Sequence, residues 1–389
     1  MADAFIVGAA RTPLGSFQGA LSSVPAPRLG AVAIAEAARR ARVDVAAADA
    51  VYMGNVLSAG VGQAPARQAA KHAGVPDAVP ATTVSKVCGS GLEAVVLATR
   101  AIRLADAELV IAGGMESMSR APYALPRARS GYRMGHGEVL DLMIHDGLWD
   151  PYGNIHMGNA AELCSRTYDI SREQQDAFAI ESYRRAVAAS AASAAEIAEV
   201  SIAERGKTTI VREDEEPKRG KLEQAKTLKP AFEAGGTVTA LNASKINDGA
   251  AAVIVASERA VKEKGLTPLA RIVSYGHHAQ APELFTTAPV HAMAKATAAA
   301  KLSAQDIDLY EINEAFAVVG IACMKLAQLD HARVNVRGGA IALGHPIGAS
   351  GARVLTTLIY SLQETQKRYG LATLCIGGGE AVAMVIERM

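Results

Sequence analysis

The sequence predicts an α/β protein built from two similar halves. Short apolar runs alternate with longer alanine-rich stretches of helical periodicity at both ends of the chain. The opening SGL of one helical stretch, at 90–92, recurs as SGA at 350–352, and IAGG at 111–114 recurs as IGGG at 376–379. The two repeats lie nearly the same distance apart, which favours an internal duplication. Strands that alternate with helices indicate a mainly parallel sheet covered on both faces.

Composition limits the kinds of partner that the chain can have. It has 389 residues, 50% of them hydrophobic, which is enough for a large core and for two or three subdomains. Its 40 basic and 39 acidic side chains leave a formal net charge of +1. This balance disfavours nucleic acid or an anionic membrane as the main partner. No apolar run reaches the roughly 18 residues that span a bilayer, and the first residues lack the basic start of a secretory signal.

The expected elements follow the same order in both halves. In the first half, apolar runs predict strands at 5–9, 51–55, 81–84 and 109–112. Alanine-rich stretches predict helices at 27–40, 66–73 and 92–104. In the second half, the corresponding strands and helices are expected at 309–312, 372–376 and 381–386, and at 315–326 and 350–362. The apolar run at 250–256 is expected to be a strand that returns to the first half.

The region between the halves has a different composition. It contains two helical patterns, at 157–168 and 172–192, followed by a charge-dense stretch at 204–229. Ser171 is the expected N-cap of the second helix, with Gln174 completing a capping box. We therefore expect an inserted subdomain that covers the functional site, and divide the chain into 1–119 with 245–268, 120–244, and 269–389.

Two of the four cysteines stand beside glycines. Cys88 falls where a strand gives way to a helix, and the positive end of the helix dipole is expected to lower the pKa of its thiol. Cys375 precedes the glycines at 377–379. No CxxC pair is present, so the chain is not a disulfide scaffold, and a reducing cytoplasm suits it best. Free cysteines are often small buried hydrophobes, and the motifs that accompany these two argue for chemistry instead.

Six motifs together resemble one enzyme family. They are VCGSG at 87–91, GGMESM at 113–118, IHMG at 155–158, NEAFA at 313–317, GGAIALGHPIG at 338–348 and CIGGG at 375–379. From end to end the chain resembles a thiolase, an acyl-CoA:acetyl-CoA C-acyltransferase. The closest subgroup is that of the mitochondrial-type biosynthetic acetoacetyl-CoA thiolases. The resemblance implies duplicated α/β halves in five layers, αβαβα, and an acetyl-CoA C-acetyltransferase that condenses two acetyl-CoA to acetoacetyl-CoA and CoA, or runs the reverse thiolysis.

The resemblance also implies a role for each catalytic residue. Cys88 is the expected nucleophile, and His345 accepts its proton. Cys375 is the expected acid and base at the α-carbon. Two oxyanion holes are implied: His345 with a water held by Asn313, and the backbone N–H groups of Cys88 and Gly377. Asn313 has an alternative interpretation as the N-cap of the helix that follows it.

The residues implied to contact substrate lie mostly in the inserted region. The implied path of coenzyme A is lined by Leu148, His156, Met157, Arg219, Ala240, Ser244, Phe285 and Phe316. Arg219 suits a phosphate, although a solvated charge is an equally good interpretation of its charged surroundings. Phe285 replaces the methionine of many biosynthetic thiolases and matches the mitochondrial type, which accepts 2-methyl-branched substrates. Glu380, so near Cys375, is expected to face away from the site.

Potassium activation is a further property of that subgroup. The implied ligands are the hydroxyl of Tyr183 and carbonyl groups near Ala240, Leu241, Ala243 and Ile341. No other metal and no cofactor is expected, since coenzyme A is substrate and product and no Cys/His pair has metal-ligand spacing.

Three alternatives remain open on the sequence. A degradative 3-ketoacyl-CoA thiolase of broader chain length has the same motifs. A ketoacyl synthase resembles the fold but lacks the second catalytic cysteine. A catalytically silent CoA-binding protein is disfavoured by the complete set of Cys88, Asn313, His345 and Cys375. The expected partners are acyl-CoA molecules and further copies of the chain, as a dimer or tetramer, in the metabolism of fatty acids and ketone bodies.

Overall fold

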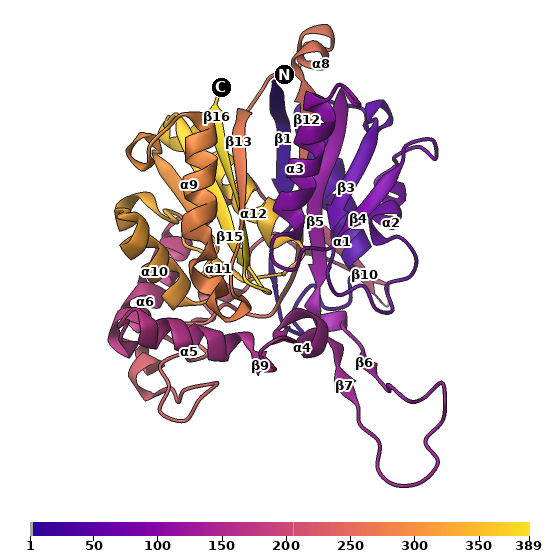
Figure 1. Cartoon of the computed structure of the whole chain (residues 1–389). Helices are drawn as coiled ribbons and strands as arrows, with labels where there is room; N and C mark the ends of the chain where they lie inside the picture. The colour runs from indigo at the N-terminus through magenta and orange to yellow at the C-terminus, as the bar shows by residue number, and fades with distance from the viewer. Residues whose placement is uncertain (1–2, 205) are drawn as a thin grey trace.

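A mixed β-sheet forms the centre of the protein (Figure 1). The computed structural model describes residues 3–204 and 206–389. The sheet has ten strands, of which β2 (Gly15–Ser16) pairs with β12 beside the main path. Along that path the order is β14 (Leu309–Ile312), β15 (Tyr369–Ile376), β16 (Glu380–Arg388), β13 (Ala270–Ala279), β1 (Ala4–Arg11), β12 (Asn247–Ser257), β5 (Leu109–Ser117), β3 (Ala50–Gly54) and β4 (Ala81–Val84).

The two halves of the chain meet at a short pairing in the middle of this path. Strands β1 and β13 pair antiparallel between Ala4 and Ile6 on one side and Ala270 and Ile272 on the other. Beyond this contact the strands of the two halves diverge in Figure 1. The first half contributes β1, β12, β5, β3 and β4, and the second contributes β14, β15, β16 and β13. Every residue of β12 is buried, which explains its continuous apolar sequence.

The prediction of a mainly parallel sheet is wrong for the centre of the sheet. Strands β3 and β4, β3 and β5, and β14 and β15 are parallel, as predicted for strands joined through helices. The pairs of β1 with β12 and β13, of β12 with β5, and of β16 with β13 and β15 are antiparallel. The cause is visible between β15 and β16, where residues 377–379 make a tight turn that leaves no room for a crossover helix.

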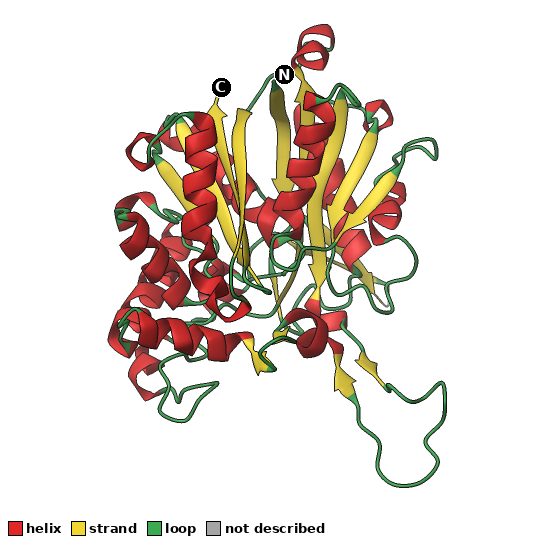
Figure 2. Cartoon of the chain, in the orientation of Figure 1, coloured by secondary structure: helices red, strands yellow, loops and turns green. Residues whose placement is uncertain are grey.

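Helices cover both halves and also fill the space between them (Figure 2). Helices α1 (Ala26–Ala41) and α2 (Pro65–His72) pack on the outer face of the first half. Helices α9 (Ala288–Ala300) and α10 (Ala317–Ala327) pack on the outer face of the second half. Helices α3 (Ser90–Arg103) and α12 (Ser350–Thr365) share one apolar core with strands of both halves. This gives the predicted αβαβα layers.

The two central helices approach each other most closely where they begin. A Cβ atom added at Gly351 would lie 2.2 Å from the backbone nitrogen of Leu92, and one added at Gly91 would lie 2.7 Å from that of Ala352. These glycines belong to the repeated SG pairs of the two halves, and β5 and β15 follow the two helices in the same way. The predicted repeat therefore matches two equivalent helices that cross at their N-termini.

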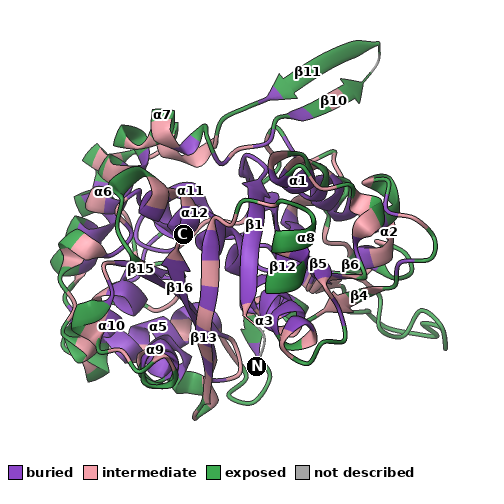
Figure 3. Cartoon of the chain, turned by 90° about the horizontal axis from the view of Figure 1, so that it is seen from above, coloured by how far each residue is buried: buried purple, intermediate pink, exposed green. Residues whose placement is uncertain are grey.

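The segment between the halves lies at one end of the sheet. Its helices are α4 (Leu142–Gly147), α5 (Met157–Thr167), α6 (Arg172–Ala188), α7 (Ser190–Ser193), η3 (Glu216–Lys218) and η4 (Leu222–Thr227). Its strands pair as β6 (Tyr123–Ala124) with β7 (Leu140–Asp141), β8 (Trp149–Asp150) with β9 (Ile155–His156), and β10 (Val200–Glu204) with β11 (Lys207–Val211). Figure 3 shows β10 and β11 extending away from the body of the molecule.

The predicted capping box of α6 is present. The N–H of Ser171 donates to Gln174 Oε1 at 2.8 Å, and the N–H of Gln174 donates to Ser171 Oγ at 3.3 Å. The predicted helix at 172–192 is broken after Ala188. The remaining short elements are η1 (Val45–Ala47), η2 (Met118–Arg120), α8 (Glu258–Glu263), η5 (Pro282–Thr287), η6 (Ala304–Asp306), η7 (His331–Arg333) and α11 (Ala340–Leu343). Within the described residues, every helix is too short or too polar to cross a bilayer.

The crossing of α3 and α12 makes Gly351 sensitive to substitution. We expect Gly351→Ala to lower the free energy of unfolding by about 2–3 kcal/mol, because the new methyl group meets backbone that cannot move away. The gain in helix propensity, about 1 kcal/mol, is too small to offset this. Gly30→Ala in α1 is the matched control, since its nearest neighbour is the movable sulfur of Met115 at 2.6 Å. Equal urea unfolding curves for the two variants would contradict the crossing.

Candidate active site

A small pocket brings together residues that are far apart in the sequence. Its volume is about 50 Å³. It is lined by Val87, Cys88, Gly147, Leu148, His156, Met157, Ser244, Phe285, Ala315, Phe316, His345 and Gly377. Residues 87, 315 and 377 follow the ends of β4, β14 and β15, where the carboxyl ends of parallel strands commonly form ligand sites.

A strained turn positions Cys88. The hydroxyl of Ser90 accepts the N–H of Lys86 at 2.8 Å and donates to the carbonyl of Val87 at 2.7 Å. The backbone φ of Val87 is +44°, a left-handed conformation that costs a β-branched residue free energy. Helix α3 then begins at Ser90, two residues beyond the thiol. The turn therefore holds Cys88 at the pocket at the expense of local strain.

Burial dominates the ionisation of Cys88. Loss of solvent raises the pKa of its thiol to about 11, although hydrogen bonds from the backbone N–H groups of Gly377 and Cys88 act in the opposite direction. The prediction that the helix N-terminus lowers this pKa is therefore wrong, because desolvation outweighs it. The two N–H groups nevertheless donate to the sulfur from two separate segments of the chain. They form a preorganised pair of donors beside the nucleophile.

Glycine has different roles at the three positions after β15. Gly378 and Gly379 have φ of +89° and +85°, and a Cβ atom at Gly379 would lie 2.3 Å from the carbonyl oxygen of Gln280. The turn requires glycine at these two positions. At Gly377 a Cβ atom would meet only Met157 Sδ at 3.5 Å and Val87 Cγ1 at 3.6 Å, both at ordinary contact distance. The fold itself would accept a side chain there, but that side chain would enter the pocket.

The hydrogen bonds of His345 define its tautomer. Its Nδ1 lies 2.6 Å from Ser350 Oγ, and that hydroxyl donates its own hydrogen to the carbonyl of Pro346 at 2.9 Å. Nδ1 must therefore carry the ring proton and donate to Ser350. This leaves Nε2 as an unprotonated base. Burial and the nearby Arg353 guanidinium lower the pKa of His345 to about 3, so the imidazole is neutral at physiological pH.

Asn313 faces this histidine. Its Nδ2 lies 3.4 Å from His345 Nε2, and its buried Oδ1 has no partner among the described atoms. The alternative in which Asn313 caps the next helix does not hold, because α10 begins four residues later and Phe316 occupies its N-cap position. The side-chain carbonyl oxygen of Asn313 is thus free to orient a ligand.

Cys375 lies behind the pocket. It is fully buried at the end of β15 and belongs to the same apolar cluster as Met157, Phe285 and Phe316. Burial raises the pKa of its thiol, and the negative charges that Cys88 and Cys323 would carry add to the rise. Glu380 pairs with Lys86, as expected of a carboxylate that faces away.

Most of the residues predicted to contact coenzyme A lie at this pocket. His156 caps α5, accepts the N–H of Gly158 at 3.0 Å and stacks on Phe232 with ring centroids 4.8 Å apart. Arg219 and Ala240 are the exceptions. Arg219 is exposed beside Glu215, and the carbonyl of Ala240 accepts a hydrogen bond from Lys245.

Sequence reasoning missed residues that support the site. The side chain of Asn247 accepts the backbone N–H of His345 at 3.0 Å, and the carboxylate of Glu116 accepts that of Gly348 at 2.9 Å. Burial raises the pKa of Glu116 to about 7. Glu116 lies in one of the six motifs and Asn247 directly follows the inserted segment, so only their contacts reveal their function. Ser350 appeared merely as the start of a helix.

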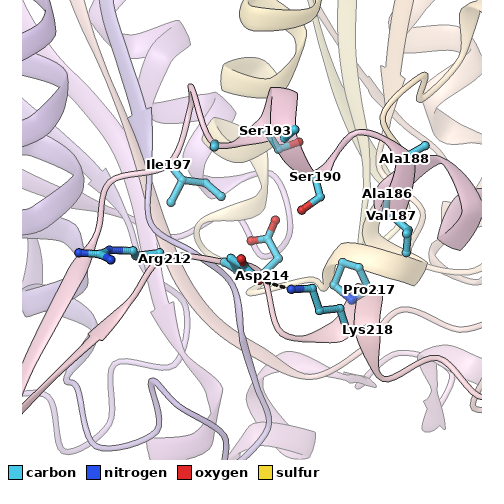
Figure 4. Close-up of a pocket in the computed structure, with 13 residues that line it drawn as sticks. Ala186, Val187, Ala188, Ser190, Ser193, Ile197, Arg212, Asp214, Pro217 and Lys218 are labelled. Carbon is cyan, nitrogen blue, oxygen red and sulfur yellow. Dashed lines mark hydrogen bonds and ion pairs between the residues drawn. The ribbon is translucent and has the colours of Figure 1, made fainter.

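A larger cavity lies elsewhere, at the C-terminal end of α6 (Figure 4). Its volume is about 490 Å³, and its lining consists of residues 186–188, 190, 191, 193, 194, 197, 212–214, 217 and 218. None of the predicted catalytic side chains is part of that lining. The smaller pocket is therefore the candidate active site on chemical grounds, not on size.

Comparisons with known proteins cover the whole chain. The family description "Thiolase, N-terminal domain" matches residues 4–259, and "Thiolase, C-terminal domain" matches residues 266–388. The chain is 52% identical to acetyl-CoA acetyltransferase 2 of Arabidopsis thaliana, over 99% of this chain and 97% of that protein. It is 51% identical to the acetyl-CoA acetyltransferase of Escherichia coli over the full length of both. The crystal structure of the Bacillus anthracis acetyl-CoA acetyltransferase superposes with a TM-score of 0.98 at 40% identity, covering 100% of this chain and 99% of that one.

The raised pKa of Cys88 predicts how its reactivity depends on pH. With a pKa of about 11, the thiolate fraction grows about tenfold per pH unit below that value, and alkylation by iodoacetamide follows it. We expect the alkylation rate to rise steadily between about pH 7 and 10, without the plateau near pH 8 that a lowered pKa would produce. His345 adds no step, because it remains neutral throughout. Cys88→Ser supplies the background rate, and a plateau would contradict the dominance of burial.

Proposed function

Because the chain belongs to the thiolase family, we propose that it is an acetyl-CoA acetyltransferase that forms acetoacetyl-CoA through an acetyl-Cys88 intermediate. One observation carries the proposal: Cys88, the N–H of Gly377 and the basic Nε2 side of His345 meet at one pocket. The curated relatives that cover the whole chain bear the same activity in their names.

The first half-reaction is acyl transfer to sulfur. His345 Nε2 takes the proton of Cys88, and the sulfur attacks the carbonyl carbon of acetyl-CoA. The bond to the sulfur of CoA breaks, and the departing thiolate receives the proton of Cys375, which leaves Cys375 as a thiolate. The tautomer set by Ser350 lets Nε2 of His345 play two roles. Nε2 is first a base, and once protonated it donates its N–H to the substrate oxygen. Asn313 is positioned to share this oxygen through a water.

The second half-reaction makes the carbon–carbon bond. Cys375, as thiolate, removes a proton from the methyl group of a second acetyl-CoA, and the resulting carbanion attacks the acetyl group on Cys88. The bond between that group and Cys88 breaks, which releases acetoacetyl-CoA. The sulfur of Cys88 takes its proton back from His345, and Cys375 keeps the proton from the methyl group, so all three groups end as they began. The N–H groups of Cys88 and Gly377 stabilise the negative oxygen of the acetyl-enzyme. The two raised pKa values keep both thiols neutral until substrate arrives.

The size of the pocket favours a short acyl group. Its volume is about 50 Å³, and the rings of Phe285 and Phe316 belong to its wall. A long-chain 3-ketoacyl-CoA would have to displace this packed wall, which supports the acetyl-transfer activity over the degradative alternative.

Several finer features belong to the same proposal. The enzyme uses no cofactor besides its CoA substrates, acts in the cytoplasm in the metabolism of fatty acids or ketone bodies, and assembles as a homodimer or tetramer. The balanced net charge of +1 supports the absence of nucleic acid and membrane partners. The division of the chain at 120–244 follows the change of composition there.

Single substitutions of the two cysteines separate the half-reactions. Cys88→Ser is expected to abolish acetylation of the protein and to lower turnover roughly a thousandfold or more. Cys375→Ser is expected to keep acetylation by acetyl-CoA but to lose condensation. Mass spectrometry measures acetylation, and release of CoA measures turnover. Cys323→Ser is the control, since Cys323 is as fully buried as Cys375 but its sulfur contacts the carbonyl of Thr286. Acetylation of the Cys88 variant would overturn the proposed nucleophile.

Phe285 supports a proposed tolerance of 2-methyl-branched substrates. Phe285 belongs to η5, and its buried side chain lines the pocket. A flat ring leaves space that a flexible methionine side chain can fill. We expect kcat/KM for 2-methylacetoacetyl-CoA to lie within about tenfold of that for acetoacetyl-CoA, and Phe285→Met to lower this ratio about tenfold. The unbranched substrate is the internal control, and an unchanged ratio would remove Phe285 from substrate selection.

A further inference from the structure

The segment 239–245 folds around the ammonium group of its own lysine. Lys245 Nζ donates to the carbonyl of Ala240 at 2.7 Å and to that of Ala243 at 2.8 Å, and lies 3.4 Å from that of Leu241. The ring of Tyr183 covers it, with Nζ 5.8 Å from the ring centroid. Carbonyl oxygens together with an aromatic face make a binding site for a cation.

This ammonium keeps its charge near neutral pH in spite of its burial. Burial lowers the pKa of Lys245 to about 8, although the carboxylates of Glu216 and Glu314 act in the opposite direction. At neutral pH most of the side chains are therefore protonated. A positive charge is thus part of the folded structure at this place.

The same oxygens are those that the thiolase resemblance assigns to potassium. The carbonyls of Ala240, Leu241 and Ala243 accept from Lys245, and Tyr183 turns its ring toward the ammonium. The ammonium of Lys245 already occupies the space between these oxygens. A potassium ion bound to them would therefore contact a second positive charge. The residues present therefore do not fit a bound potassium ion.

We propose that the ammonium of Lys245 is a built-in cation that replaces potassium in this protein. Lys245 is a positioning residue, because the segment it ties together reaches the active site at three points. The N–H of Ser244 donates to the carbonyl of Ala315 at 2.9 Å, residues 243 and 316 pair as a β-bridge, and the N–H of His345 donates to the carbonyl of Lys245 at 3.3 Å. The cation therefore orders both the wall that faces coenzyme A and the backbone of the catalytic histidine.

Opening the site tests this proposal. Lys245→Gly removes the ammonium and leaves the carbonyl oxygens without a cation. We expect its melting temperature to fall and its kcat/KM to fall about tenfold, as for loss of a charge-assisted hydrogen-bond set. Potassium chloride is expected to restore most of both losses, whereas choline chloride at the same ionic strength is not. The wild type is expected to show the same melting temperature and activity in either salt.

Two further variants make the result decisive. Lys245→Met keeps the length of the side chain without its charge, so it is expected to lose stability and gain nothing from potassium. Lys264→Gly, an exposed position at the end of α8, is the control for a surface lysine. Potassium activation of the wild type, or a Lys245→Gly variant that ignores potassium, would overturn the proposal. If the glycine variant does not fold, the wild type and the methionine variant still decide. The melting temperature needs no assumption about the reaction, so it separates this proposal from the proposed function.

Discussion

The close crossing of α3 and α12 is the constraint on which the active site depends. Gly91 and Gly351 bring the two helix N-termini into backbone contact. Cys88 lies two residues before the first helix, and His345 lies five residues before the second and bonds to its first residue, Ser350. The crossing therefore places the nucleophile and its base at the same pocket. Any side chain at the crossing would separate the helices and, with them, the two catalytic groups.

Removal of water sets the resting state of the site. Burial raises the pKa values of both catalytic thiols and lowers that of His345, so all three groups are neutral before substrate binds. Because the site is neutral, no charged group has to be desolvated before the reaction. Negative charge develops on the substrate oxygens only during the reaction, where N–H donors already point at them. The N–H groups of Gly377 and Cys88 are such donors, held by a strained Val87 on one side and a glycine turn on the other. The strain and the turn thus serve the same purpose as the pKa shifts.

The sequence predicted the chemistry of the site better than the sheet that carries it. Cys88, His345 and Gly377 stand in short motifs whose residue types are dictated by local chemistry, so they are legible without a structure. Whether two strands pair parallel or antiparallel depends on which strands become neighbours. No local sequence pattern indicates that β1 pairs with β12 on one side and with β13 on the other. β13 was missed because every second residue in it is half-exposed and most of these residues carry polar groups, as in Arg271, Tyr275 and His277, in contrast to the apolar runs elsewhere. Ser350 and Asn247 were missed for a related reason, since a serine at a helix start and an asparagine after a loop are common without function.

The order of the loop at 239–245 depends on different solution conditions when its cation is a lysine side chain and when it is a free ion. A potassium ion occupies its site according to its concentration, whereas Lys245 is always present and loses only the freedom of its side chain, at most about 2 kcal/mol. Potassium does not titrate, but an ammonium with a pKa of about 8 does. The charged groups that act on it are Glu216 and Glu314, and Tyr183 covers it. Burial lowers the pKa of Lys245 in the folded protein. The loop therefore loses its positive charge as the pH rises through about 8. The chain thereby exchanges dependence on a salt for dependence on pH.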